Sequence, residues 1–313
     1  MPRKVIIDCD PGIDDALALT LALFDPRLEV VAITAVAGTV SADRATLNVQ
    51  AIVERLDPPR YPRLGAATAA EDVPYTDGRY LHGADGLGGT GLQVSKLARQ
   101  HPAEKLISDE VRAAPGDITI VCLGPLTNVA RALVREPDLA DLISRIVIRG
   151  GSVKGIGDVT PCAESNIYAD PAAARAVFKS PITKTLIPLD VTDQVVWNLD
   201  FLEKLPADFS RAGKLLRATL PYLYRSHRQH LGMESIRLPD AVGLCAVLHP
   251  ELFHTEELAG DVETGGEVAT GATIFDRRPN SPHRAEMEVA LEVDAAAVAD
   301  CIVRGLAQAG LQT

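Results

Sequence analysis

A chain of 313 residues, 47% of them hydrophobic, can bury a large core, and we expect it to fold as one domain over residues 1–313. Its net charge of -11 would repel phosphate backbones and anionic headgroups, so neither nucleic acid nor a membrane surface is an expected partner. The sequence has no apolar run long enough for a signal peptide or a membrane span, and its five cysteines form no C-x-x-C pair, which together predict a cytoplasmic protein.

Strand-like apolar runs alternate with helix-like segments along the chain. The predicted strands are 5–8, 29–36, 118–123, 145–148, 185–191 and 285–293, and the predicted helices are 14–23, 42–56, 126–134, 171–178 and 295–307. Residues 202–230 are helix-rich, 261–275 are typical of an antiparallel piece, and 57–91 form a long connection. Repeated βα units with continuous apolar strands predict an α/β fold with an open, mainly parallel central sheet and helices on both faces.

Polar residues follow several of the predicted strands. They lie in the segments 8–15, 38–41, 123–128 and 150–166. In open parallel sheets, ligands bind beyond the carboxyl ends of the strands, so these segments are the candidate site.

The first of these segments, DCDPGIDD, holds four carboxylates in eight residues. Helix capping accounts for one or two of them, such as Asp14 and Asp15. Asp8 and Asp10 are crowded at the strand end, where repulsion costs free energy unless a cation or a proton is shared. All the candidate ligands are hard oxygens, which favours Ca²⁺ or Mg²⁺ over zinc.

Residues 5–17, VIIDCDPGIDDAL, closely resemble the N-terminal signature of the inosine-uridine-preferring nucleoside hydrolases. Further matches follow in the order of that family: His82-Gly83, LGPLTN at 123–128, Gly150-Gly151, AESN at 163–166, Asp170-Pro171 and Pro239-Asp240. The resemblance covers nearly the whole chain. It implies the nucleoside hydrolase fold, a homodimer or homotetramer, and Ca²⁺-dependent hydrolysis of the N-glycosidic bond of a ribonucleoside or related N-riboside, an activity of purine and pyrimidine salvage.

The same resemblance implies roles for individual residues. Ca²⁺ would bind to the carboxylates of Asp10, Asp15 and Asp240 and to the backbone carbonyl of Leu123, and Asp10 would also be the general base. Substrate contacts would come from Asp14, Thr39, His82, Asp158, Glu164, Asn166 and Asp240. Asp8 would either orient Asp10 or bind the metal more distantly. His82, in a Gly-rich loop, is either a surface residue or a substrate contact.

Several positions depart from the family pattern. Thr39 and Asp158 stand where Asn is common, Arg149 replaces an apolar residue that is often Met, and Ser165 replaces an aromatic. Pro239 stands where well-studied members have a His that protonates the departing base, and proline cannot donate a proton. The remaining candidates for that proton are His227, His230, Arg149 and Arg237.

Two other interpretations remain open at this stage. A strand that ends in D-x-D also resembles the nucleophile loop of aspartyl-phosphate phosphatases, although those proteins normally have Thr or Val at the position of Gly12. A Ca²⁺- and riboside-binding relative without efficient turnover is the second alternative. The retained general base and metal carboxylates favour an enzyme over that binding protein.

Overall fold

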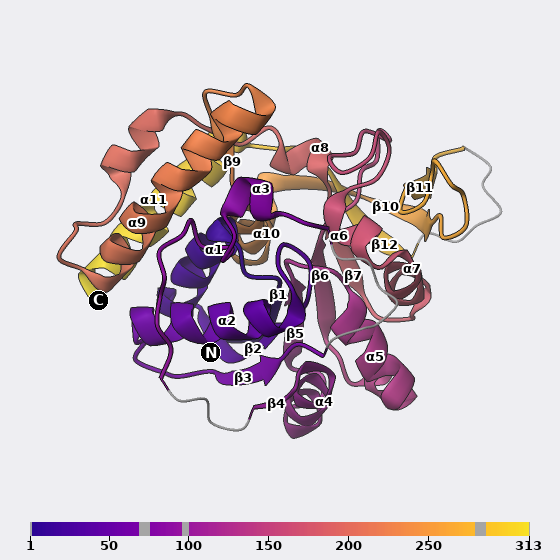
Figure 1. Ribbon diagram of the computed structural model, residues 1–313. Helices are drawn as coiled ribbons and strands as arrows, with labels where there is room; N and C mark the ends of the chain where they lie inside the picture. Colours follow the sequence, from indigo (N-terminus) through magenta and orange to yellow (C-terminus); the bar gives the residue numbers. More distant parts are fainter. Residues whose placement is uncertain (1, 69–75, 96–99, 279–285, 313) are drawn as a thin grey trace.

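The computed structural model describes residues 2–68, 76–95, 100–278 and 286–312 (Figure 1). Its central strands are β1 (Arg3–Cys9), β2 (Leu28–Ala35), β3 (Arg63–Ala66), β4 (His101–Pro102), β5 (Ile118–Cys122), β6 (Arg145–Arg149), β7 (Lys184–Ile187), β10 (Phe253–Val262), β11 (Thr273–Asp276) and β12 (Met287–Val293). They form one sheet in the order β11-β10-β12-β7-β6-β5-β1-β2-β3-β4. All pairs from β12 to β4 are parallel, whereas β10 runs antiparallel to both β12 and β11. The predicted mainly parallel sheet is therefore confirmed.

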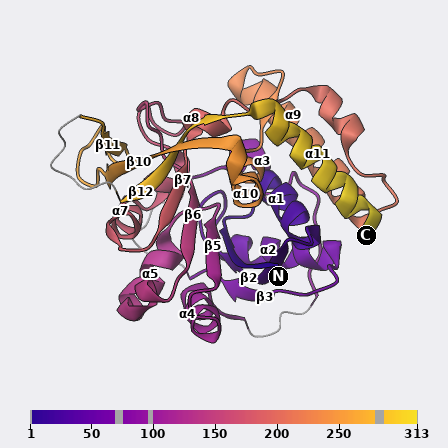
Figure 2. The same cartoon turned by 180° about the vertical axis from the view of Figure 1, so that it is seen from behind.

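Helices cover both faces of this sheet, as the two opposite views show (Figure 1; Figure 2). One face carries α1 (Ile13–Phe24), α2 (Ala42–Leu56), α9 (Arg211–Ser226), α10 (Pro239–Leu248) and α11 (Ala295–Gln312). The other carries α4 (Ala103–Ala113), α5 (Thr127–Arg135) and α7 (Pro171–Lys179). Along β1, Val5 and Ile7 belong to the first core and Ile6 to the second, because successive side chains of a strand point to opposite faces.

Short elements connect these layers. They are α3 (Arg79–His82), α6 (Ser165–Ala169), α8 (Leu189–Thr192), η1 (Pro137–Asp141), η2 (Leu199–Lys204), η3 (His227–Leu231), η4 (Pro250–Leu252) and the antiparallel pair β8 (Val196–Trp197) and β9 (Ile236–Arg237). Across the described ranges, we find no helix that is both long and apolar enough to cross a membrane.

Three local predictions differ from the structure. The strand predicted over 185–191 ends at Ile187, because Pro188 has no N–H for the ladder and α8 begins directly after it. The long connection 57–91 contains β3 and α3, which are too short for a clear periodic signal. The amphipathic helix α4 was not predicted.

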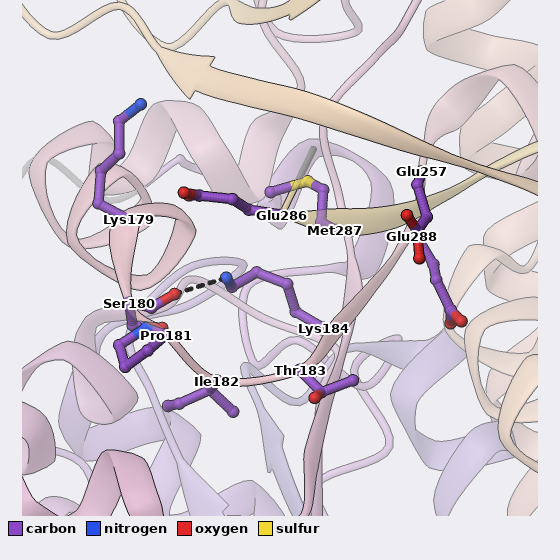
Figure 3. Close-up of a pocket in the computed structure, with 10 residues that line it drawn as sticks. All are labelled: Lys179, Ser180, Pro181, Ile182, Thr183, Lys184, Glu257, Glu286, Met287 and Glu288. Atoms are coloured by element: carbon purple, nitrogen blue, oxygen red, sulfur yellow. Dashed lines mark hydrogen bonds between the residues drawn. The ribbon is translucent and has the colours of Figure 1, made fainter. Parts of the chain in front are cut away.

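A depression at the amino-terminal end of β7 holds a buried lysine (Figure 3). The ammonium of Lys184 donates to the carbonyl of Ser180 at 2.7 Å, directly after the end of α7. The last carbonyls of a helix carry partial negative charge, so a lysine here stabilises the helix end. This contact gives Lys184 a structural role.

Candidate active site

A cleft lies at the carboxyl ends of the parallel strands, and three of the four predicted polar segments line it. The predicted site residues along its wall are Asp10, Asp14, Asp15, Thr39, His82, Asp158, Asn166 and Asp240. The fourth segment, 123–128, reaches the site through contacts of Leu123 and Gly124. The topology therefore brings together residues that are far apart in the sequence, as expected for this class of sheet.

Asp10 follows the last residue of β1 and is held in one position. Its Oδ2 accepts a hydrogen bond from the backbone N–H of Thr39 at 2.6 Å. A Cβ on Gly38 would overlap the same oxygen, and a Cβ on Gly124 would lie 2.6 Å from Oδ1. Both glycines are thus needed for space, a requirement that sequence reasoning missed because it depends on three-dimensional approach. Burial raises the pKa of Asp10 to about 7.

Three further carboxylates form a buried cluster. Each of Asp14, Asp15 and Asp240 offers an oxygen within 4.8 Å of the other two. One oxygen of Asp15 accepts from the Gly12 N–H at 2.8 Å, while Oδ1 has no hydrogen-bond partner. Burial raises the pKa values of Asp15 and Asp240 well above the usual range, and the neighbouring carboxylates add to the shift. Such a set of crowded oxygens, one of them without a partner, could hold a metal ion.

Asp14 differs from its two neighbours. Burial would raise the pKa of this carboxyl, but the charge of Arg149, the neighbouring His82 and hydrogen bonds from Asp240 and the backbone together lower it. Asp14 therefore favours its ionised form, and it also contacts Asp240 by a hydrogen bond.

The carbonyl of Leu123, predicted as a metal ligand, accepts a hydrogen bond in this structure. The donor is Asn166 Nδ2 at 2.6 Å, which also lies 3.3 Å from the carbonyl of Arg149. A carbonyl oxygen has two lone pairs, so this bond leaves Leu123 one further acceptor position. Asn166 thus joins the ends of β5 and β6 at the floor of the site.

Arg149, the last residue of β6, pairs with two carboxylates. Its Nε donates to Asp240 Oδ1 at 2.8 Å and its Nη1 to Glu164 Oε1 at 2.5 Å. The other oxygen of Glu164 accepts from the N–H groups of Gly151 and Ile167, which caps α6. The sequence showed Arg149 as a departure from the family pattern, but it did not predict these ion pairs. Their only signal in the sequence was a charged residue at the end of an apolar strand.

Asp158 and Ser165 extend this polar network along the cleft. The hydroxyl of Ser165 donates to Asp158 Oδ2 at 3.2 Å and lies 3.1 Å from Glu164 Oε1. Burial raises the pKa of Asp158 to about 6, and the charge of Glu164 adds to the shift.

His82 lines the cleft and is not a surface residue, so of the two alternatives from the sequence the substrate contact remains. Its Nδ1 accepts from the N–H of Ile13 at 3.0 Å and lies 3.7 Å from Asp14 Oδ1. With Nδ1 as acceptor, the neutral ring carries its proton on Nε2. Burial lowers the pKa of His82 and favours this neutral form.

Among the candidate proton donors, His227, Arg149 and Arg237 line the cleft and His230 does not. His227 Nδ1 lies 3.0 Å from the carbonyl of Leu223, and burial lowers its pKa. The ring of His230 packs edge-on against Tyr80, with centroids 5.8 Å apart. Tyr80 is a cleft residue that sequence reasoning missed, although it lies two positions before His82.

Asp8 is not part of the cleft lining. Its Oδ1 accepts from the hydroxyl of Thr34 at 2.6 Å and from Asn128 Nδ2 at 2.8 Å, and Oδ2 has no hydrogen-bond partner. Burial raises the pKa of Asp8 to about 7. These contacts join β1 to β2 and α5 below the site.

Comparison with known proteins gives a consistent family. The profile described as "Inosine-uridine preferring nucleoside hydrolase" matches residues 5–300. The non-specific ribonucleoside hydrolase RihC of Salmonella enteritidis is 40% identical over 295 residues, which cover 93% of this chain and 94% of that protein.

Two solved structures share the whole fold. The plant nucleoside hydrolase PpNRh1 is 34% identical with a TM-score of 0.88, over 98% of this chain and 99% of that one. The purine-preferring ribonucleoside hydrolase from Gardnerella vaginalis is 28% identical with a TM-score of 0.90, over the same shares of 98% and 99%.

Proposed function

This chain belongs to the inosine-uridine preferring nucleoside hydrolase family, and we propose that it performs the family reaction with a Ca²⁺ ion and with Asp10 as the general base. Membership makes it a hydrolase of N-glycosyl compounds, which uses water to separate the ribose of a ribonucleoside from its base. The metal, the residue roles and the base preference are the proposed part. The observation that carries the proposal is the buried cluster of Asp14, Asp15 and Asp240, in which Asp15 Oδ1 has no hydrogen-bond partner. Asp10 is not part of that group and enters the proposed ligand set through the family resemblance.

The donor set fits a hard divalent cation. We assign Asp10, Asp15 and Asp240 as its carboxylate ligands and the Leu123 carbonyl as a backbone ligand. Oxygen donors with this much negative charge match the preference of Ca²⁺. When bound, the ion would make water more acidic and neutralise charge beside the ribose.

Asp10 is the group that takes the proton from the attacking water. Burial raises the pKa of this carboxyl, which makes Asp10 a stronger proton acceptor than an exposed aspartate. The Thr39 N–H and the two close glycines limit its movement, so the carboxylate is already positioned before substrate arrives.

The ribose hydroxyls would be held by the remaining polar residues of the cleft. Those that line it are Asp14, Thr39, His82, Asp158, Asn166 and Asp240. Hydrogen bonds to hydroxyls position the anomeric carbon and strengthen as positive charge develops on the sugar. Glu164 does not line the cleft, and its oxygens accept from Arg149, Gly151 and Ile167, so its contact with a ribose hydroxyl is proposed from the family resemblance alone.

Pro239, the first residue of α10, lines the cleft and supplies no proton. Protonation of the departing base therefore falls to another group or to solvent, and of the candidates named from the sequence His227, Arg149 and Arg237 line the cleft. His227 Nδ1 faces the carbonyl of Leu223, so the proton that this ring could give to the base is the one on Nε2 of its protonated form.

The experiment is release of 4-nitrophenolate from 4-nitrophenyl β-D-ribofuranoside, with and without EDTA, beside a panel of purine and pyrimidine nucleosides. This substrate needs little help in leaving-group protonation, so it reports the metal and the base alone. We expect release that EDTA abolishes and that Asp10→Ala lowers strongly. Absence of release from folded, Ca²⁺-loaded protein would support the binding-protein alternative instead, and EDTA-resistant release would remove the metal from the proposal.

A further inference from the structure

Arg149 places a permanent positive charge inside the carboxylate site. Its side chain is 10% exposed, and its two partners Glu164 and Asp240 are 0% and 2% exposed. The guanidinium cannot lose its proton, so the charge is present at every pH at which the protein is folded. Ion pairs this buried are screened little by salt.

This charge acts on the same carboxylates that we assign to the metal. Arg149 donates directly to Asp240 Oδ1, and its electrostatic influence extends to Asp14 and Asp10. In the metal-free protein, the guanidinium thus neutralises part of the negative charge that burial makes costly. A divalent cation bound to Asp240 would be repelled by that guanidinium and would share its acceptor.

We propose that Arg149 competes with the metal ion for the carboxylates, an inference that rests on the proposed metal site. Arg149 stabilises the metal-free protein and weakens its affinity for Ca²⁺. Arg149 is a positioning residue in this scheme, because it acts through Asp240 and Glu164. The consequence is a site that tolerates loss of its metal, since the carboxylates keep a cationic partner when the ion leaves.

A merely structural role for Arg149 would give a different result. If the guanidinium only supported the fold, its removal would destabilise the metal-free and the metal-bound protein by similar amounts. A competitor stabilises the first form and disfavours the second, so its removal has opposite effects on stability without metal and on metal affinity.

The test compares Arg149→Met with Arg149→Lys and Arg149→Gln. Lysine keeps the charge, and glutamine keeps a hydrogen-bond donor without charge, which preserves the test if the methionine variant does not fold. The control is Arg237→Met, because Arg237 also lines the cleft but pairs with Asp193, outside the cluster. Ca²⁺ binding is measured by calorimetry at about pH 8.5, where protons compete least with the ion. Thermal unfolding of each variant is followed in EDTA and in excess Ca²⁺.

We expect Arg149→Met and Arg149→Gln to lower the Kd for Ca²⁺ about tenfold or more, because the repulsion between one buried unit charge and the ion is large enough to weaken binding by at least that factor. The same variants should unfold at lower temperature in EDTA and show a larger Ca²⁺-induced shift. Arg149→Lys should stay close to the parent, and Arg237→Met should leave the Kd unchanged. Equal or weaker Ca²⁺ binding by both neutral variants would overturn the inference. If the folded parent and every variant bind no Ca²⁺, both the metal assignment and the Arg149 inference fail. If only the neutral variants bind Ca²⁺, the Arg149 inference is supported.

Discussion

Two glycines decide where the proposed base can sit. Gly38 has no room for a Cβ because that atom would overlap Asp10 Oδ2. We therefore predict that Gly38→Ala displaces the carboxylate and lowers kcat roughly 100-fold or more, the usual scale for losing a well-placed general base. The measurement is steady-state hydrolysis of 4-nitrophenyl riboside with excess Ca²⁺.

The control for this change is Gly265→Ala, since a Cβ there would lie 3.8 Å from Glu263 Oε1, its nearest neighbour. It should retain the kcat of the parent. A Gly38→Ala enzyme with normal kcat would show that Asp10 needs no such fixed position.

A separate prediction concerns Pro239 and the protonation of the leaving group. Proline at the first position of α10 has no hydrogen bond to lose, so Pro239→His should be tolerated by the fold. An imidazole beside the departing base can donate a proton, and we expect about a tenfold or greater rise in kcat/KM for natural nucleosides. The rate with 4-nitrophenyl riboside should hardly change. An equal gain on both substrates would mean that the histidine acts through something other than leaving-group protonation.

Sequence reasoning predicted most single residues of the cleft but not their pairing. Asp10 and Asp15 could be named because carboxylates crowd after a strand and match a specific family signature, whereas Asp240 was named from the family resemblance alone. The ion pairs of Arg149 and the close approach of Gly38 could not be named, because both depend on how β2 and β6 lie against the β1–α1 turn. Such contacts have no periodic signal in one sequence.

At the scale of elements, Asn128 joins three parts of the fold. Its Nδ2 donates to Asp8 Oδ1 and to the carbonyl of Ala35, both at 2.8 Å, so α5 is tied to the ends of β1 and β2. We predict that Asn128→Ala costs about 2–4 kcal/mol of unfolding free energy, because it removes one of the two donors to the buried Asp8 carboxyl and the side-chain donor to the Ala35 carbonyl. Urea unfolding measures this value.

Asn198→Ala provides the matched control for that loss. Asn198 is exposed and makes no capping hydrogen bond at the start of η2, so its truncation should change stability by less than about 0.5 kcal/mol. Similar losses for the two variants would show that the buried contacts of Asn128 contribute little.

The accuracy of the predicted elements follows from their length and surroundings. The helix predicted over 42–56 has the bounds of α2, since it is long and amphipathic and ends at Asp57 in a left-handed conformation. The predicted 185–191 strand was wrong beyond Ile187, where Pro188 ends the ladder. Neither β3 nor α3 was predicted. Each has only four residues, and in segments this short the tertiary contacts determine the structure more than the local sequence pattern does.

At the scale of the whole molecule, the parallel sheet was predictable because its strands are apolar on both faces, as in β5, where all five residues are buried. The single domain, the homo-oligomer and the cytoplasmic location stay predictions. The oligomeric state depends on the outer surface of the protein, and the location depends on the cell, whereas the contacts described here lie inside one chain.

Removal of the metal should make the stability of the whole chain depend on pH in a defined direction. Burial raises the pKa values of Asp8 and Asp10 to about 7 and those of Asp15 and Asp240 further. A carboxyl with a folded pKa above its unfolded value of about 4 binds its proton more tightly in the folded protein. Its contribution to stability is therefore complete below about pH 4 and is lost as the pH rises through about 7.

Protein in EDTA should accordingly lose thermal stability between about pH 5 and about pH 8. Bound Ca²⁺ would take the place of those protons and keep the carboxylates neutralised, so the loaded protein should lose much less over the same interval. The stabilisation by Ca²⁺, measured as the difference in Tm between the two conditions, should grow with pH. Parallel curves in EDTA and Ca²⁺ would mean that the ion does not bind at the buried carboxylates, because binding there must exchange with the protons that burial retains.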